Sequence, residues 1–135
     1  MTGEYRILKG LYYSKEHEWA KIEKTGKVRI GITDYAQQTL HEIVFIEMVS
    51  VGTKIKQMEM IGTVESIKAV SDVFSPISGE VIDANEDLIM TPELINEDPY
   101  VKGWIVLLDP DNLEKDLSQL MSANEYKATL KDIEH

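Results

Sequence analysis

Lys68 is the residue whose setting most clearly invites chemistry. It lies in the stretch "VESIKAVSD" (64–72), between two short runs of strand character. The neighbours Ser66 and Ala69 are small, so little bulk crowds the amine. A lysine near a turn is usually a solvated charge. An exposed and rigidly held lysine is also what an enzyme needs in order to reach and acylate the amine, so both interpretations stay open at this point.

A second group that could do chemistry is "EHE" (16–18), where two carboxylates flank one imidazole. These are local N and O ligands with no third site at a recognisable spacing, so no metal centre is predicted. The chain also shows no nucleophile elbow, phosphate loop or paired-carboxylate pattern. No catalytic residue is therefore predicted.

Composition narrows the class of protein. The 135 residues fit one domain with a modest core, and 43% hydrophobic with 28% charged residues indicate a globular chain. The net charge of −10 argues against nucleic-acid binding, because a phosphate backbone would be repelled, and it favours basic partners. Without cysteine, any thiol chemistry would have to reside on an attached cofactor. No apolar run is long enough for a membrane span and the first residues lack a secretory core, so we expect a cytoplasmic location.

Strand patterns dominate the first part of the chain and must position these residues. Apolar and charged residues alternate over 19–32 around Thr25-Gly26, which predicts a hairpin. A short helix with Thr33 as its N-cap is predicted for 33–42. The β-branched and aromatic run 43–49 predicts a buried strand.

The pattern changes towards the C-terminus. The continuous apolar run "GWIVLLD" (103–109) predicts a central strand. From Asp111 the pattern is helical, and Ser122 with Glu125 forms a capping-box signature before a last short helix. Strands first and helices last predict an antiparallel β domain with a helical tail.

"ESIKAVSD", followed by "SPISGEVIDAN", resembles the lipoyl-lysine segment of the glycine cleavage system H protein family. The likeness covers nearly the whole chain. In the order typical of the family come "YSKEHEWAKIE", "VRIGITDYAQQTLHEIVFIE", "VESIKAVSDVFSPISGEVIDANEDL", "PELINEDPYVKGWIVLL" and "SANEYKATL". The stretch "MVSVGTKIKQMEM" departs from the acidic and glycine-rich pattern of the family, but the spacing to Lys68 is kept.

The resemblance implies a fold, namely a mainly β barrel-sandwich hybrid of two antiparallel sheets. Short helices and a C-terminal helical segment would complete it, and Lys68 would lie on a tight hairpin. The implied organisation is a single lipoyl-carrier domain over 1–135, with a core at 11–109 and a helical tail at 111–135.

The resemblance also implies a carrier, not an enzyme. Lipoate would be joined to Lys68 through an amide by a lipoate ligase or lipoyl transferase that recognises Glu65, Ser66 and Ala69. Pyridoxal-phosphate-dependent glycine decarboxylase (P protein) would load an aminomethyl group, and tetrahydrofolate-dependent aminomethyltransferase (T protein) would remove it. Dihydrolipoyl dehydrogenase (L protein) would reoxidise the arm. We expect a monomer without nucleic-acid or membrane partners, and the lack of cysteine suits the role because protein thiols could exchange with the cofactor disulfide.

Members of the family shield the loaded arm in a surface cleft. The matching acids here are Glu18 of "EHEW" and Asp72 of "VSD". A protonated amine in a partly dry cleft is stabilised by nearby carboxylates. On an extended strand Glu16 would share a face with Glu18 while His17 takes the other, so Glu16 joins the predicted cleft. The competing interpretation is that these are ordinary surface acids.

Three other functions remain open. A lipoyl relay or reservoir, which supplies lipoate to other complexes, would have nearly the same sequence. A biotin carrier has a related fold, but methionines typically flank its lysine, whereas Ile67 and Ala69 do so here. An unmodified binding module or enzyme would show no lipoyl increment in the intact mass of native protein.

Overall fold

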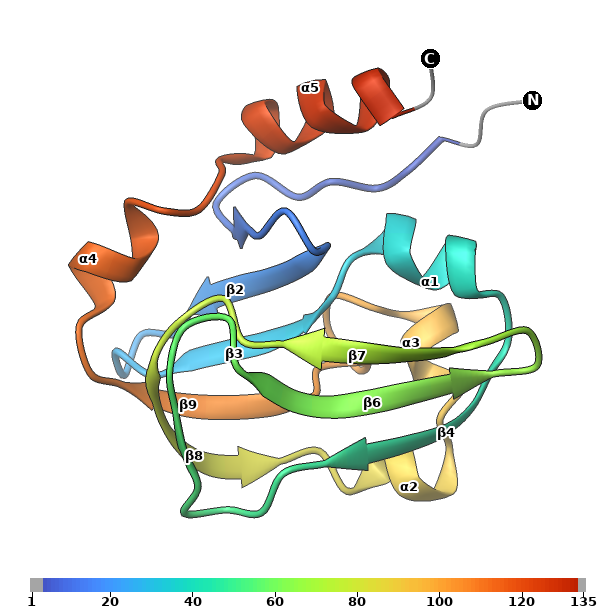
Figure 1. Cartoon of the computed structure of the whole chain (residues 1–135), viewed down its shortest axis with the longest axis horizontal. Helices are drawn as coiled ribbons and strands as arrows, with labels where there is room; N and C mark the ends of the chain where they lie inside the picture. Colours follow the sequence, from blue (N-terminus) through green and yellow to red (C-terminus); the bar gives the residue numbers. More distant parts are fainter. Residues whose placement is uncertain (1–3, 134–135) are drawn as a thin grey trace.

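The chain folds into two antiparallel β-sheets with short helices at their margins (Figure 1). This computed structural model describes residues 4–133, so the first three and last two residues of the predicted domain lie outside the described part. The larger sheet has the strand order β1-β2-β3-β9-β8-β5, and the smaller sheet has the order β4-β6-β7. The predicted fold class, mainly β with two antiparallel sheets and a C-terminal helix, is confirmed.

The strands of the larger sheet are β1 (Tyr12–Tyr13), β2 (Glu18–Ile22), β3 (Val28–Ile32), β5 (Lys54–Ile55), β8 (Gly79–Ala84) and β9 (Val106–Pro110). Those of the smaller sheet are β4 (Ile43–Met48), β6 (Met60–Ser66) and β7 (Val70–Phe74). The helices are α1 (Asp34–Leu40), α2 (Asp87–Met90), α3 (Leu94–Glu97), α4 (Leu113–Leu117) and α5 (Ala123–Ile133). As predicted, β9 is central, since it pairs with both β3 and β8.

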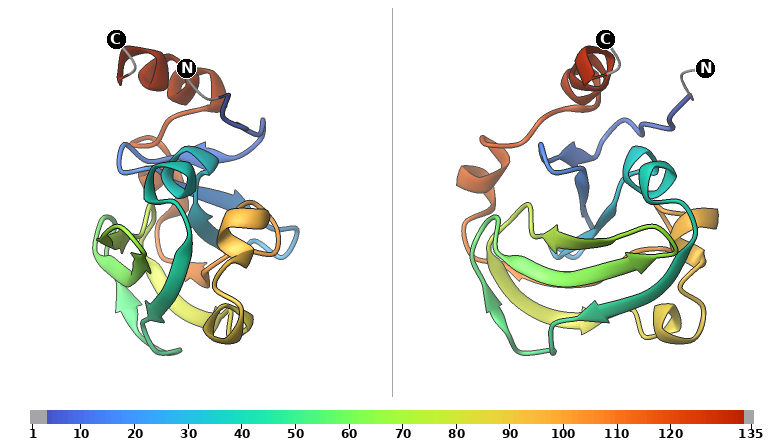
Figure 2. Two further views of the ribbon diagram at one scale, coloured as in Figure 1. Left: turned by 90° about the vertical axis from the view of Figure 1, so that its right-hand side faces the viewer. Right: turned by 45° about the vertical axis from the view of Figure 1, so that its right-hand side comes forward.

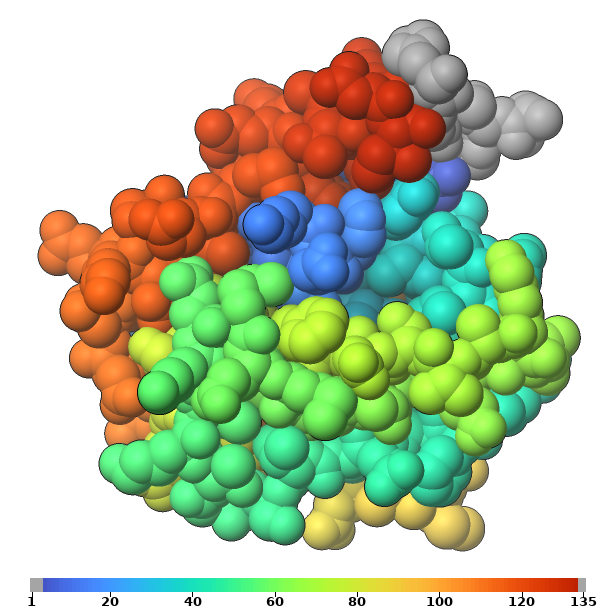
Figure 3. All heavy atoms as spheres, in the orientation of Figure 1, coloured from blue at the N-terminus to red at the C-terminus, as the bar shows by residue number. Residues whose placement is uncertain are grey.

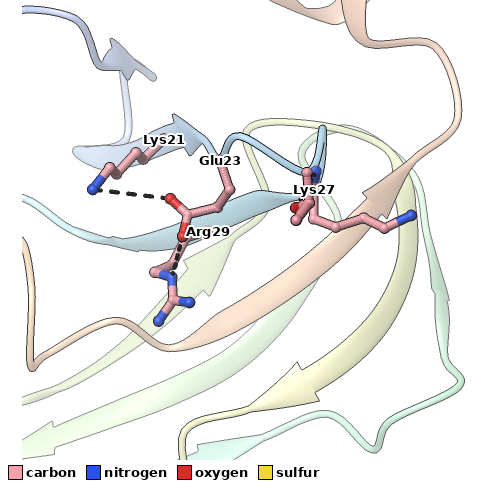
Figure 4. A network of polar contacts seen from close by, with 5 residues as sticks. Lys21, Glu23, Lys27 and Arg29 are labelled. Atoms are coloured by element: carbon pink, nitrogen blue, oxygen red, sulfur yellow. Dashed lines mark hydrogen bonds and ion pairs between the residues drawn. The ribbon is translucent and has the colours of Figure 1, made fainter.

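The β2–β3 hairpin forms where the alternating pattern predicts it. Gly26 takes a φ of +87° at the turn, which glycine adopts without a steric penalty. Near the turn, Glu23 forms ion pairs with Lys21 at 3.9 Å and Arg29 at 3.3 Å (Figure 4). The Arg29 guanidinium also lies 4.4 Å from the centre of the Trp104 ring. These contacts tie the polar face of the hairpin to the loop before β9.

The apolar core lies between the two sheets, which Figure 2 shows as separate layers. Ile30, Val81 and Leu108 point into it from the larger sheet, and Ile61 and Val64 from the smaller one. All five side chains are buried. Lys68 and its hairpin are therefore carried by one layer of a packed sandwich.

Strand β4 differs from its prediction as a buried strand. It is an edge strand of the smaller sheet, and only Ile43 and Ile46 are buried, whereas Val44 and Phe45 are exposed. β-Branched and aromatic residues favour strands, but their presence does not reveal how many faces the rest of the chain covers.

The predicted helix caps are present. Thr33 precedes α1 and its side chain accepts a hydrogen bond from the Ala36 N–H at 3.2 Å. Before α5, Ser122 Oγ accepts from the Glu125 N–H at 3.2 Å, while Glu125 Oε1 accepts from the Ser122 N–H at 2.8 Å. This reciprocal pair is the capping box predicted from the sequence.

Helix α5 packs beside the N-terminal segment and β1, as Figures 1 and 2 both show. Tyr126 is fully buried and stacks on Tyr13 with ring centroids 4.6 Å apart. The Tyr126 hydroxyl lies 2.7 Å from Thr33 Oγ1 and 2.9 Å from His17 Nδ1. Among residues 4–133, no helix combines the length and the apolar composition needed to cross a membrane.

Candidate functional site

Lys68 lies at the tip of the β6–β7 hairpin. The pair Glu65 and Val70 is in register across the two strands, and the Ser66 N–H donates to the Ala69 carbonyl at 2.8 Å. Three residues, Ile67, Lys68 and Ala69, connect the strands, and all three are exposed. The tight hairpin expected around Lys68 is present.

Ser66 shapes this turn from within. It is buried, and its Oγ accepts hydrogen bonds from the N–H groups of Lys68 at 3.1 Å and Ala69 at 3.0 Å. The same hydroxyl lies 3.2 Å from the Ala69 carbonyl, to which it donates. No residue of the tip has a positive φ. The Ser66 hydroxyl thus accepts from the backbone N–H groups of a turn for which many hairpins use glycine.

The tip is also hydrogen-bonded to the C-terminal end of α1 and to the segment that follows it. The Ile67 N–H donates to the Glu42 carbonyl at 3.2 Å, and Lys68 Nζ donates to the Thr39 carbonyl at 3.3 Å. Carbonyl groups in the last turn of a helix lack intrahelical partners and attract positive charge. The backbone of the tip is therefore fixed, while the Lys68 amine has a solvent-exposed contact that can be given up.

Beside the tip lies a polar surface hollow of about 720 Å³ between α1 and α3. Its lining is Gln37, Gln38, His41, Glu42, Glu93, Asn96 and Glu97. Asn96 holds the hollow together, because its Oδ1 accepts from the Ile43 N–H at 2.9 Å and its Nδ2 donates to the His41 carbonyl at 2.8 Å. The hollow is acidic and offers no exposed apolar anchor.

Glu18 lies in the interior and not on an open cleft wall. It is 1% exposed, and its Oε1 accepts from Ser14 Oγ at 2.5 Å while its Oε2 accepts from the Phe74 N–H at 3.1 Å. Because β2 and β7 belong to different sheets, this carboxyl group joins the two layers. Burial raises the pKa of Glu18 to about 7, against the lowering effect of the hydrogen bonds from Ser14 and Phe74.

The other two predicted cleft acids are placed differently. Asp72 is exposed on β7, two residues before the Phe74 N–H that Glu18 binds. Glu16 is exposed in the turn before β2. The expectation that Glu16 and Glu18 share a strand face is wrong, because β2 begins at Glu18 and His17 has a φ of 72°. The structure thus brings Glu18 into contact with β7, the strand that carries Asp72. Glu16 is not part of this junction.

Sequence reasoning missed Ser14 and the two carbonyl groups that hold the tip. Ser14 lies four residues before Glu18, and only a small hydroxyl side chain at that place could have suggested a partner for a buried acid. The carbonyl groups of Thr39 and Glu42 are backbone atoms, so no residue type marks them. His17 of "EHE" is held by Tyr126 at 2.9 Å.

Two packed antiparallel sheets with an exposed lysine on a tight hairpin define a class of small β-sandwich domains. The family model described as "Glycine cleavage H-protein" matches residues 11–133. The chain belongs to this family.

Individual relatives agree with the family match. A probable glycine cleavage system H protein of Pyrococcus abyssi is 51% identical over 132 residues, which are 98% of each chain. A glycine cleavage system H protein of Coprothermobacter proteolyticus is 49% identical over 122 residues, which are 90% of this chain and 95% of the relative. The crystal structure of a glycine cleavage system H protein from Mycobacterium marinum has a TM-score of 0.84 at 33% identity and covers 93% of this chain and 99% of its own.

Proposed function

We propose that this chain is the lipoyl-lysine carrier of the glycine cleavage system, with Lys68 as the attachment residue. The observation that carries the proposal is the exposed Lys68 amine on a hairpin tip whose backbone is fixed by Ser66 and Glu42. An acyl group on Nζ would replace an exposed hydrogen bond, since within residues 4–133 this amine donates to the Thr39 carbonyl at the surface. The residues present therefore fit a covalent lipoyl group.

In this role the bound lipoyl group would supply a disulfide that accepts an aminomethyl group and two electrons. The chain would carry that aminomethyl group from the pyridoxal-phosphate-dependent glycine decarboxylase to the tetrahydrofolate-dependent aminomethyltransferase. Dihydrolipoyl dehydrogenase would then restore the disulfide. The protein itself provides attachment, reach and shielding, so we regard it as a shared substrate of these enzymes and not as an enzyme.

Shielding is proposed to involve β7. Asp72 is four residues beyond Lys68, at most ~13 Å away at the ~3.3 Å rise of an extended strand, and nearer because Lys68 lies in the turn before β7. An extended lysine side chain with its acyl group lying along β7 would bring its far end towards Asp72. Glu18 lies further along at Phe74. An ammonium group close to Glu18 would favour the ionised carboxylate and lower its pKa from about 7, so Glu18 could respond to a loaded arm.

The attachment residue is tested with lipoate ligase, ATP and lipoate. Wild type should gain one lipoyl mass increment, which fragmentation locates on Lys68, because the ligase needs an accessible primary amine. Lys68→Arg keeps the positive charge but offers a guanidinium that cannot accept the acyl group, so it should stay unmodified. Lys54→Arg is the matched control, since Lys54 is also an exposed lysine, on β5. Labelling of the Lys68→Arg protein at another lysine would overturn the assignment.

Function in glycine cleavage is tested with the lipoylated protein and the purified decarboxylase. Glycine-dependent release of carbon dioxide should require lipoylated wild type, and the protein should gain the aminomethyl mass. A protein that is lipoylated on Lys68 but is not loaded by the decarboxylase would support a lipoyl relay instead.

A further inference from the structure

The smaller sheet leaves one face uncovered, and its side chains are arranged in two rows. In the first row, Phe45 of β4 is opposite Glu65 of β6, which is opposite Val70 of β7. Residues directly opposite on paired strands share a face. We call the residues of the two rows, Phe45, Glu47, Thr63, Glu65, Val70 and Asp72, the outer face.

The second row contains Glu47, Thr63 and Asp72, again in register across the three strands. In Figure 3 the atoms of β4, β6 and β7 form the band turned towards the viewer, and α4 and α5 lie clear of it. Neither the helices nor the termini of residues 4–133 cover this band in any of the three ribbon views.

The apolar members of the outer face are unusually accessible. Phe45 is 48% exposed and Val70 is 66% exposed, and Ile67 at the adjoining tip is 72% exposed. Aromatic side chains with their large apolar area are typical central anchors of protein interfaces. Phe45 and Val70 therefore flank Glu65 across the sheet, and Ile67 adds an exposed apolar side chain next to Lys68.

Charge on the outer face has one sign. Glu47, Glu65 and Asp72 are acidic, and neither row contains a lysine or arginine. Lys68 lies beside the face at the tip, and its acylation would remove the positive charge nearest to these acids. A partner that covers this surface must bring basic groups around an apolar pocket, because unpaired buried carboxylates would be strongly unfavourable.

We propose that the outer face is the docking surface for the enzyme that acylates Lys68, with Phe45 inserted in an apolar pocket and basic residues opposite Glu47, Glu65 and Asp72. This inference rests on the proposed function, because it assumes that Lys68 is acylated. The enzyme must place its active site on Lys68, so it must cover a surface next to the tip. Of the two neighbouring surfaces, the hollow between α1 and α3 is polar, whereas the outer face supplies an aromatic anchor.

The first test removes the anchor. Phe45→Ala should raise the KM of lipoate ligase for the unmodified protein roughly ten- to thirty-fold, the size expected for the loss of an interface anchor, and should leave kcat within about twofold. Met90→Ala is the matched control, because Met90 is 86% exposed on α2 and lies off the outer face. Equal KM values for the two variants would overturn the proposal. Thermal unfolding of both variants checks that the fold is kept.

The second test reverses charge. Glu47→Lys should weaken binding of the unmodified protein to the ligase and flatten the dependence of the association rate on salt. Asp132→Lys changes the net charge equally from an exposed position on α5 and should have a much smaller effect. Identical salt dependence in both variants would refute the charge argument.

The tests separate this inference from the proposed function and from self-association. If wild type is never acylated on Lys68, the proposed function fails. If wild type is acylated and Phe45→Ala behaves as Met90→Ala does, only the docking surface fails. Sedimentation of wild type and Phe45→Ala tests whether a second copy of this chain covers the outer face. If wild type is a dimer and Phe45→Ala is a monomer, the outer face is a dimer interface and the proposal is overturned.

Discussion

Replacing Glu18 by glutamine should change how stability depends on pH. Glu18 is buried where β2 meets β7, and burial raises its pKa from 4.5 to about 7. Glutamine has the same shape and can still accept from the Phe74 N–H, while its amide N–H can donate to Ser14. Glu18→Gln therefore removes the titration and keeps most of the packing.

The sign and size follow from the two pKa values. Because the pKa is higher in the folded state, the folded protein binds more protons than the unfolded chain between pH 4.5 and about 7. The stabilisation is fully present below pH 4.5 and is lost as the pH rises through about 7. At ~1.4 kcal/mol for each pKa unit, wild type should lose roughly 3 kcal/mol of unfolding free energy relative to Glu18→Gln over this range.

The assay is urea unfolding of both proteins at a series of pH values from acid to mildly alkaline, at constant ionic strength. Groups common to the two proteins cancel in the difference, so the difference curve reports Glu18 alone. Glu16→Gln is the control, because Glu16 is exposed and its curve should run nearly parallel to wild type. A flat difference curve for Glu18→Gln, or one in which wild type gains stability towards high pH, would refute the reasoning.

Three further outcomes are expected. Ser66→Ala should destabilise the tip, because the buried Oγ accepts hydrogen bonds from two N–H groups. Urea unfolding should show a loss of about 1–2 kcal/mol, and a ligase assay should show several-fold slower acylation of Lys68. Lipoylation turns one ammonium into an amide, so the protein, with a net charge of −10, becomes more negative by one charge and should elute later on anion exchange. Its melting temperature should stay unchanged. Asp72→Asn should speed the loss of formaldehyde from the loaded arm about two- to fivefold, the range of an exposed ion pair, and an unchanged rate would exclude Asp72 from shielding.

Local patterns predicted much of the fold. The β2–β3 hairpin, the Thr33 cap of α1 and the Ser122–Glu125 capping box each depend on residues a few positions apart, and each is present. The tight hairpin at Lys68 is also present, and there the expectation came from the resemblance to the family and not from a local pattern.

Long-range contacts explain what the sequence could not predict. Glu18 is buried because Phe74, 56 residues later, meets it at the junction of the sheets. Likewise, the left-handed His17 separates Glu16 from β2, and Tyr126 holds that histidine from the other end of the chain. The exposure of Phe45 depends on which face the helices leave open, which no property of β4 itself encodes.

The contacts at the tip divide into those that modification leaves alone and one that it changes. The Ser66 hydroxyl and the Glu42 carbonyl hold backbone N–H groups, which acylation of the side chain does not touch. The hydrogen bond from Lys68 Nζ to the Thr39 carbonyl, by contrast, involves the reacting atom, and because it is exposed we expect its loss to have little effect on stability. We therefore expect the tip to keep the same backbone shape before and after acylation. A carrier handled in turn by several enzymes needs this property, because each enzyme must find the same hairpin whatever the arm bears.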